Sequence, residues 1–176
     1  MKIGFARREI TPPVGTELGG YAGYRPCSGV HDPLWCKAVV LEQDGILYGL
    51  VALDLMWADE VLHQRIAKAA GIPAERLIVC AIHSHAAPQG IFPGEGPLAS
   101  VNSSSDPRHG DFPAYLESVV RQAAEAWTAA MENLETFQMY IARGEAPLVG
   151  SERHTGGVPE GELTVLRFRT DSAKVL

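Results

Sequence analysis

The sequence predicts an α/β fold: a mixed β-sheet with a β-α-β unit, flanking helices and long loops rich in glycine and proline. Three observations lead to this prediction. Two apolar, β-rich runs lie on either side of an amphipathic helical stretch. The 18 Gly and 12 Pro gather between the periodic segments. A length of 176 residues suits one well-packed core. We therefore expect residues 1–176 to form a single α/β domain.

Composition excludes several classes of protein. The net charge of -6, from 15 Lys and Arg against 21 Asp and Glu, provides no basic stripe for a phosphate backbone, so nucleic acid is not an expected partner. No run approaches the ~18 apolar residues of a membrane span. Residues 1–10 carry charges where a signal peptide needs an apolar core, which predicts a cytoplasmic location. Three cysteines without Cys-x-x-Cys spacing are expected to be free thiols.

The first half of the chain reads as strands joined by loops. Residues 2–10 alternate loosely and stop at a Pro-Pro pair, which predicts a short strand, and the aperiodic stretch 14–33 predicts a long ordered loop. Residues 34–42 and 46–55 are β-rich on either side of Asp44-Gly45, so they predict a hairpin. Because the second run is apolar on both faces, it should be a central strand.

A β-α-β unit is predicted next. The helix over residues 59–70 begins at Asp59 and ends at Gly71, and a strand follows over 76–82. The two strands joined by this helix should be parallel, with a right-handed crossover. Asp54 and His83 would then leave the sheet at the same edge.

The second half contains one long loop, one long helix and two strands. Residues 86–113 are rich in Gly, Pro and Ser and are typical of a lid or a pocket wall. Apolar residues at three- and four-residue steps predict a helix over 112–134, capped by Asp111. Residues 136–142 and 163–169 predict two further strands.

His83 and His85 are the main functional candidates. In an extended backbone, residues i and i+2 point to the same face with Cα atoms roughly 7 Å apart. Two imidazoles at a strand end could thus converge on one metal ion or one substrate carbonyl. The alternative is that both histidines cap a turn.

Three other polar residues are candidates for a supporting or catalytic role. Asp54 interrupts a buried strand and could orient a metal-bound histidine or cap the following helix. His31, next to Asp32, could support the site or could be a turn histidine bonded to its own loop. Arg153 could anchor a substrate carbonyl or carboxylate, or lie on the surface. The serine run 103–105 has no strand-turn-helix context, so it predicts a loop and not a nucleophile.

An ordered set of motifs resembles the amino-terminal part of the neutral/alkaline ceramidase family, zinc-dependent amidases that split N-acyl-sphingosine. The hallmark of that family is Thr-His-Thr-His-Ser-Gly-Pro, and both histidines and the proline agree here. The motifs are Gly4–Pro12, Gly20-Tyr21, Gly29–His31, Leu53-Asp54, Ile82–Pro88 and Val165–Phe168.

The resemblance implies roles for individual residues. His83 would be a ligand of one zinc ion, His85 would donate to the scissile carbonyl oxygen, and Arg153 would lie near the substrate carboxyl group. It also implies further His, Glu and Tyr ligands and a serine beyond the Val165–Phe168 strand. The zinc site is therefore expected to be incomplete within this chain, and a second copy or a further portion of chain is expected to cover the sheet.

Three functions remain open at this point. The first is a zinc-dependent amide hydrolase of ceramidase-like type that acts on an N-acyl or lipid-like small molecule. The second is a catalytically incomplete or binding-only domain that keeps the scaffold. The third is a different metal-dependent hydrolase, in which His31, His109 or His154 joins His83 and His85 in a self-contained site. Whether the chain is an enzyme depends on completion of the site.

Overall fold

The computed structural model describes residues 1–20, 25–96, 112–146 and 161–172. They fall into two compact units, Met1–Leu134 and Glu135–Leu176, each of which is described by itself. The expectation that residues 1–176 form one domain stays a prediction.

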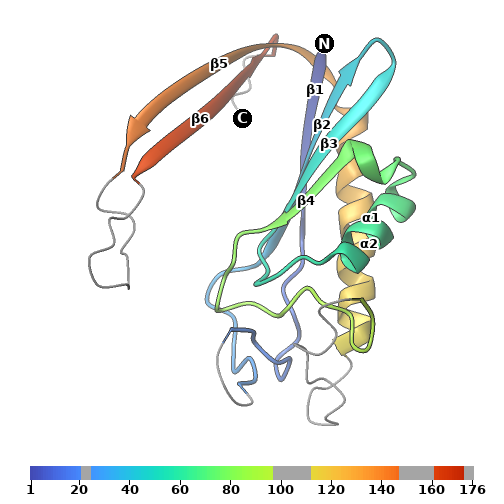
Figure 1. The fold of residues 1–176 in the computed structure, drawn as a ribbon, viewed down its shortest axis with the longest axis vertical. Helices are drawn as coiled ribbons and strands as arrows, with labels where there is room; N and C mark the ends of the chain where they lie inside the picture. The colour runs from blue at the N-terminus through green and yellow to red at the C-terminus, as the bar shows by residue number, and fades with distance from the viewer. Residues whose placement is uncertain (21–24, 97–111, 147–160, 173–176) are drawn as a thin grey trace. The chain divides into compact units, whose positions relative to one another are not determined.

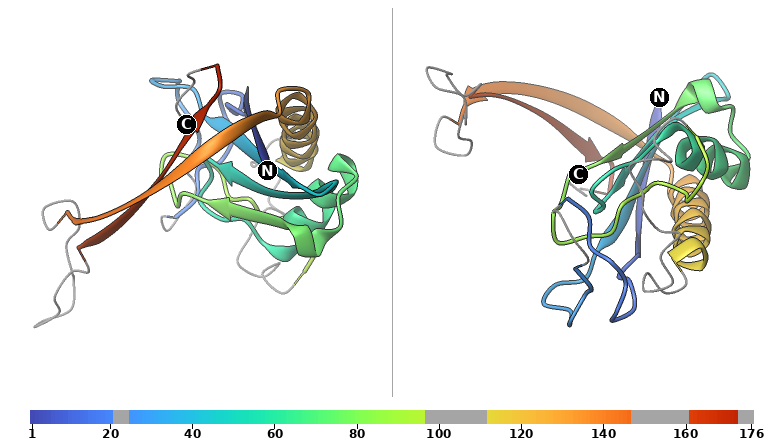
Figure 2. Two further views of the ribbon diagram at one scale, coloured as in Figure 1. Left: turned by 90° about the horizontal axis from the view of Figure 1, so that it is seen from above. Right: turned by 60° about the horizontal axis from the view of Figure 1, so that its bottom comes forward.

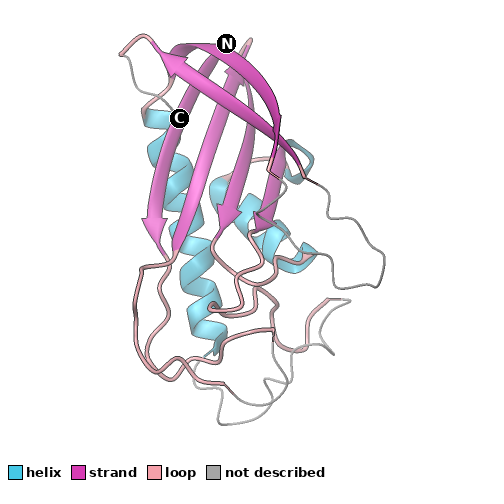
Figure 3. Cartoon of the chain, turned by 90° about the vertical axis from the view of Figure 1, so that its left-hand side faces the viewer, coloured by secondary structure: helices cyan, strands magenta, loops and turns pink. Residues whose placement is uncertain are grey.

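The first unit is built on a mixed sheet of four strands, which confirms the predicted fold class. These are β1 (Lys2–Glu9), β2 (Trp35–Gln43), β3 (Ile46–Leu53) and β4 (Leu77–Ala81), in the spatial order β4-β3-β2-β1. β2 pairs antiparallel with both β1 and β3, and β3 pairs parallel with β4. Figure 3 shows these strands side by side with the helices behind them. The β2–β3 hairpin turns at Asp44, whose φ is +53°, and Gly45, as the sequence predicts.

Helix α1 (Glu60–Ala70) connects β3 to β4, followed by the short 3₁₀ helix η1 (Ala74–Arg76). The Asp59 side chain accepts a hydrogen bond from the Leu62 N–H at 2.9 Å, and Gly71 ends the helix with a φ of +69°. The predicted caps and the predicted parallel pairing are thus confirmed.

Two helices cover one face of this sheet (Figure 1). The long helix α2 (Phe112–Glu132) packs against β1 and β2, and α1 packs against α2. Gly4 allows β1 and α2 to approach each other closely, because a Cβ at Gly4 would lie 1.8 Å from the Ala130 carbonyl oxygen. The predicted cap at Asp111 lies outside the described residues. The core contains, among others, Ala38, Val40, Val51, Leu53, Leu62, Ile66, Leu116, Val119, Ala123 and Trp127.

The other face of the sheet keeps large apolar side chains in contact with solvent. Tyr48 and Leu50 on β3 alternate with the buried Val51 and Leu53, and they are 47% and 37% exposed. Ile78 on β4 pairs with Leu50 and is 64% exposed. What covers this face stays a prediction. No helix in the described part of the chain is long and apolar enough to cross a membrane.

The second unit is an antiparallel hairpin of β5 (Glu135–Glu145) and β6 (Glu162–Thr170). The two strands predicted from the sequence are present and extend beyond the predicted bounds. Phe137 and Phe168 meet with ring centroids 5.4 Å apart.

The cap of α1 should make stability depend on pH. Asp59 is buried, its Oδ2 has no hydrogen-bond partner, and desolvation raises its pKa above 3.8. The folded state therefore binds the Asp59 proton more tightly than the unfolded state, and this stabilisation is lost as the pH rises through the raised pKa. Asp59→Asn keeps a cap acceptor without the charge. The free energy of unfolding is measured by urea denaturation at several pH values. As the pH increases from 3.8 to the raised pKa, the value for Asp59→Asn should rise relative to that of the parent, and above this range the difference should stay constant.

Asp44→Asn is the matched control, because it removes an exposed carboxylate from a turn. The explanation fails if the Asp59→Asn variant and the parent differ by the same amount at every pH.

Candidate functional site

Three loops meet beyond the ends of β1, β3 and β4, and they form the scaffold of the candidate site (right-hand view of Figure 2). Backbone hydrogen bonds join them. The Gly19 N–H donates to the Ala87 carbonyl at 2.8 Å, and the Met56 N–H donates to the Pro88 carbonyl at 3.0 Å. The Ser84 N–H donates to the Leu55 carbonyl at 3.2 Å, which continues the parallel register past the strands. As predicted, the segments that carry Asp54 and His83 leave the sheet side by side.

The backbone of His83 differs from the prediction. β4 ends at Ala81, and His83 has a φ of +63°, in the left-handed region that non-glycine residues rarely adopt. The expected extended His-x-His geometry is therefore wrong. Such conformations cost about 1–3 kcal/mol and persist only where surrounding contacts enforce them. The Ser84–Leu55 hydrogen bond and the contacts of the His83 ring are such contacts.

The His83 imidazole has a defined orientation. Its Nδ1 lies 3.0 Å from the Met56 carbonyl oxygen. Because a carbonyl only accepts, Nδ1 carries the proton of this hydrogen bond, and in the neutral ring Nε2 keeps its lone pair. The Trp57 ring lies against His83 with centroids 5.0 Å apart and an interplanar angle of 85°. His83 thus presents Nε2 as a ligand or acceptor.

His85 lies next to His83, although the backbone at His83 is left-handed and not extended. The two ring centroids are 5.0 Å apart at an interplanar angle of 80°. Gly20 packs against His85, because a Cβ at Gly20 would lie 2.4 Å from His85 Nδ1 and 2.6 Å from the Met56 sulfur. The structure therefore brings the two predicted histidines together.

Gly20→Ala should disturb the site far more than an equivalent change nearby. Gly15 is its matched control, because its φ of +95° resembles the +91° of Gly20, yet a Cβ at Gly15 meets nothing within 4 Å. Both alanines carry the same backbone strain, and only the one at Gly20 collides with His85. We expect Gly20→Ala to shift the ¹⁵N resonances of the His85 ring, while Gly15→Ala leaves them in place. Equal shifts in both variants would remove Gly20 from the site.

Asp54 is buried and makes two polar contacts away from the histidine pair. Its Oδ2 accepts from the Trp35 backbone N–H at 2.9 Å, and its Oδ1 accepts from Lys37 Nζ at 2.9 Å. These contacts tie the end of β3 to the start of β2, and they satisfy the carboxylate that the sequence places in a buried strand. The proposed support of a histidine by Asp54 stays a prediction.

The remaining candidates do not join the pair in the described structure. The His31 side chain is 96% exposed, and its Nδ1 bonds Asp32 at 2.7 Å, which agrees with a turn histidine bonded to its own loop. Hydrogen bonding by Asp32 raises the pKa of His31. Arg153, His109, His154 and the serine run 103–105 lie outside the described residues.

The described residues offer nitrogen donors of the kind that zinc prefers, but fewer than a zinc site needs. Imidazole nitrogen is a preferred zinc ligand, and ligating histidines usually donate their other ring N–H to a carbonyl or carboxylate, as His83 does. Among the described residues, no group of three or more His, Cys, Asp or Glu could hold a metal ion. Cys27, Cys36 and Cys80 are free thiols, but none belongs to a group of three or more metal-binding side chains among the described residues. Burial also raises the pKa of Cys36 to about 12, which disfavours the thiolate that binds a metal.

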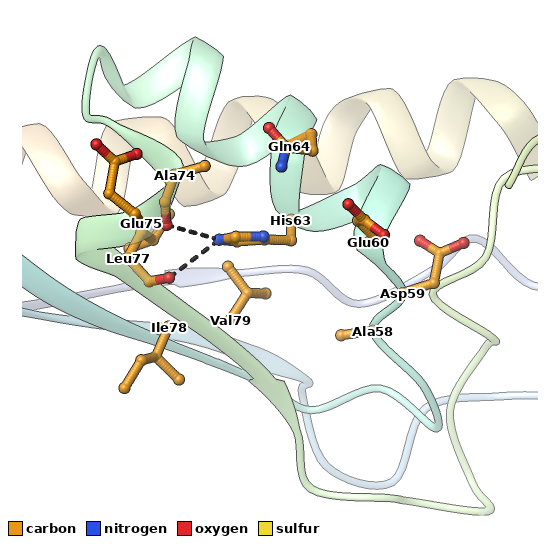
Figure 4. Close-up of a pocket in the computed structure, with 10 residues that line it drawn as sticks. All are labelled: Ala58, Asp59, Glu60, His63, Gln64, Ala74, Glu75, Leu77, Ile78 and Val79. Atoms are coloured by element: carbon orange, nitrogen blue, oxygen red, sulfur yellow. Dashed lines mark hydrogen bonds between the residues drawn. The ribbon is translucent and has the colours of Figure 1, made fainter. Parts of the chain in front are cut away.

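A separate pocket of about 680 Å³ lies between α1 and β4 and shares no residue with the histidine pair (Figure 4). Its histidine, His63, points its Nε2 at the carbonyl oxygens of Ala74 and Leu77, at 3.2 and 3.0 Å. The ring therefore ties α1 to η1 and the start of β4. We assign His63 a structural role.

Sequence reasoning missed two residues of the site, Met56 and Trp57. Neither belongs to a motif, and Met56 acts through its backbone carbonyl, which any residue carries. The only available signal was position, since both follow a central strand at its carboxyl end.

Comparison with known proteins supports one assignment. No protein-family model and no curated protein matches the sequence. The neutral ceramidase from Pseudomonas aeruginosa superimposes with a TM-score of 0.76 at 19% identity, over 99% of this chain and 30% of that one. A structure described as ceramidase complexed with C2 gives 0.72 at 19% identity, over 99% and 29%. The chain therefore spans about a third of the length of these proteins. Its fold is that of the amino-terminal part of a bacterial neutral ceramidase.

Proposed function

We propose that this chain carries part of the active site of a zinc-dependent amide hydrolase of ceramidase-like type. The observation that carries the proposal is the His83–His85 pair, in which the Met56 carbonyl fixes one ring and the second ring lies 5.0 Å away. The substrate class we propose is an N-acyl, lipid-like small molecule, in line with the ceramidases that share the fold.

His83 would hold the metal through Nε2. Its Nδ1–H bond to Met56 keeps the lone pair on Nε2 and makes that nitrogen a better donor. A zinc ion held there would supply Lewis acidity and an activated water. At least one further protein ligand must come from outside the described residues, because catalytic zinc takes three and no group of three lies among them.

His85 would stabilise the reacting carbonyl. The Nδ1 edge of its ring faces Gly20, and Nε2 would be the nitrogen that donates to the substrate. A donor placed on the carbonyl oxygen lowers the barrier as negative charge develops there. Arg153 would anchor the carboxyl end of the product, and Asp54 and His31 would support the site from outside the metal shell.

A binding-only domain is the second candidate. The shortage of metal ligands among the described residues favours it. In that case the same site would bind an acyl compound without cleaving it, and a second copy or a further portion of chain would complete the sheet.

Zinc content and turnover test the proposal together. The protein is purified without chelator or added metal, its zinc is measured by elemental analysis, and release of fatty acid from a short-chain N-acyl-sphingosine is followed. About one zinc per chain with chelator-sensitive turnover supports the hydrolase. Absence of both, with retained binding of the acyl compound, supports the binding domain and contradicts the hydrolase.

A further inference from the structure

We propose that Trp57 is a positioning residue, which holds the His83 ring in the orientation that directs Nε2 toward the metal. The purpose that we assign to Trp57 rests on the proposed function, whereas the contact between the Trp57 and His83 rings does not. Residue 57 directly follows Met56, so one short backbone segment supplies both the carbonyl that receives the His83 ring proton and the aromatic ring packed against the imidazole.

The Trp57 backbone is held firmly where it provides these contacts. Gly90 approaches it so closely that a Cβ at Gly90 would lie 2.0 Å from the Trp57 carbonyl oxygen. The neighbouring Met56 N–H is bonded to Pro88 at 3.0 Å. The indole therefore projects from a fixed backbone, as a group that positions another side chain must.

The His83 ring needs such a partner. The residue is exposed, so no close-packed core prevents the ring from turning about χ2 and exchanging Nδ1 with a carbon atom. The hydrogen bond to Met56 favours one orientation, and the edge contact with Trp57 at 5.0 Å and 85° favours the same one. Trp57 is 39% exposed and does not belong to the buried core cluster.

Substitution of Trp57 separates positioning from packing. Trp57→Leu keeps apolar bulk without an aromatic ring, Trp57→Met repeats this with a flexible side chain, and Trp57→Phe keeps an aromatic ring. Trp35→Leu is the matched control, since that half-buried indole contacts Arg7. Metal-free, ¹⁵N-histidine-labelled protein is studied at about pH 9, where an ordinary histidine is neutral. The ring ¹⁵N shifts then report the tautomer.

We expect the parent, Trp57→Phe and Trp35→Leu to show His83 as the Nδ1–H tautomer, and Trp57→Leu and Trp57→Met to show a mixture. Zinc affinity should fall about tenfold in the mixed variants, in the range for loss of an outer-shell partner. A parent-like tautomer in Trp57→Leu overturns the inference whatever the zinc affinity does. Loss of folding in both Trp57→Leu and Trp57→Met also overturns it. If the parent binds no zinc, the hydrolase proposal fails, and the tautomers still decide the role of Trp57.

Discussion

Replacement of His83 by alanine is expected to abolish zinc retention. Among the described residues, His83 is the imidazole whose Nδ1–H is bonded to a backbone carbonyl, so the lone pair of its Nε2 is available for a metal ion. Loss of an outer-shell partner alone weakens metal binding about 10–100-fold, so loss of the ligand should exceed about 100-fold. Elemental analysis of the purified variant and a zinc titration with a competing chelator measure the change.

The control is His63→Gln. This histidine donates only to the carbonyls of Ala74 and Leu77, and the glutamine amide can take over part of that role. Thermal unfolding is recorded for all variants, because alanine at a φ of +63° is strained as histidine is. Parent-like zinc content in a folded His83→Ala protein would remove His83 from the metal site.

Replacement of His85 by alanine is expected to lower kcat by about 100- to 1000-fold while zinc remains bound. This magnitude is typical of the loss of one hydrogen-bond donor to a developing oxyanion. The ring lies beside His83, and its Nδ1 edge packs on Gly20, which fixes the direction of the other nitrogen. Steady-state hydrolysis of the N-acyl substrate and the zinc content are measured on the same preparation.

His85→Gln keeps an amide donor near the same place, so it should recover part of the lost kcat. Zinc loss in His85→Ala as complete as in His83→Ala would instead make His85 a second ligand. In that case the carbonyl donor must be sought elsewhere in the site.

Much of the fold follows from local rules that the sequence displays. Asp59 and Gly71 bound α1 because one side chain satisfies a free helix N–H and the other residue adopts the left-handed conformation at little cost. Asp44-Gly45 turns the hairpin for a similar reason. The β-α-β connection required parallel strands, and the segments that carry Asp54 and His83 therefore leave the sheet at one edge, as expected.

The details of the site depend on contacts that sequence spacing does not encode. The period-two rule holds only as far as Ala81, where the strand ends, so it does not predict the turn at His83. Asp54 binds Lys37 and the Trp35 N–H, which become its neighbours only because β2 pairs antiparallel with β3. Met56 contacts His83 through its backbone carbonyl and Trp57 through its ring, and the sequence signals neither contact beyond the position of both residues after a central strand.

The left-handed backbone at His83 also sets how substitutions there would be tolerated. Glycine or asparagine adopts this conformation more easily than histidine, so either should make the folded protein more stable than the present residue does. A chain whose fold alone mattered would drift toward those residues under selection for stability. Persistence of a strained imidazole at this turn across divergent sequences would therefore indicate selection for its chemistry, and its replacement by glycine would mark a lineage in which that chemistry has been abandoned.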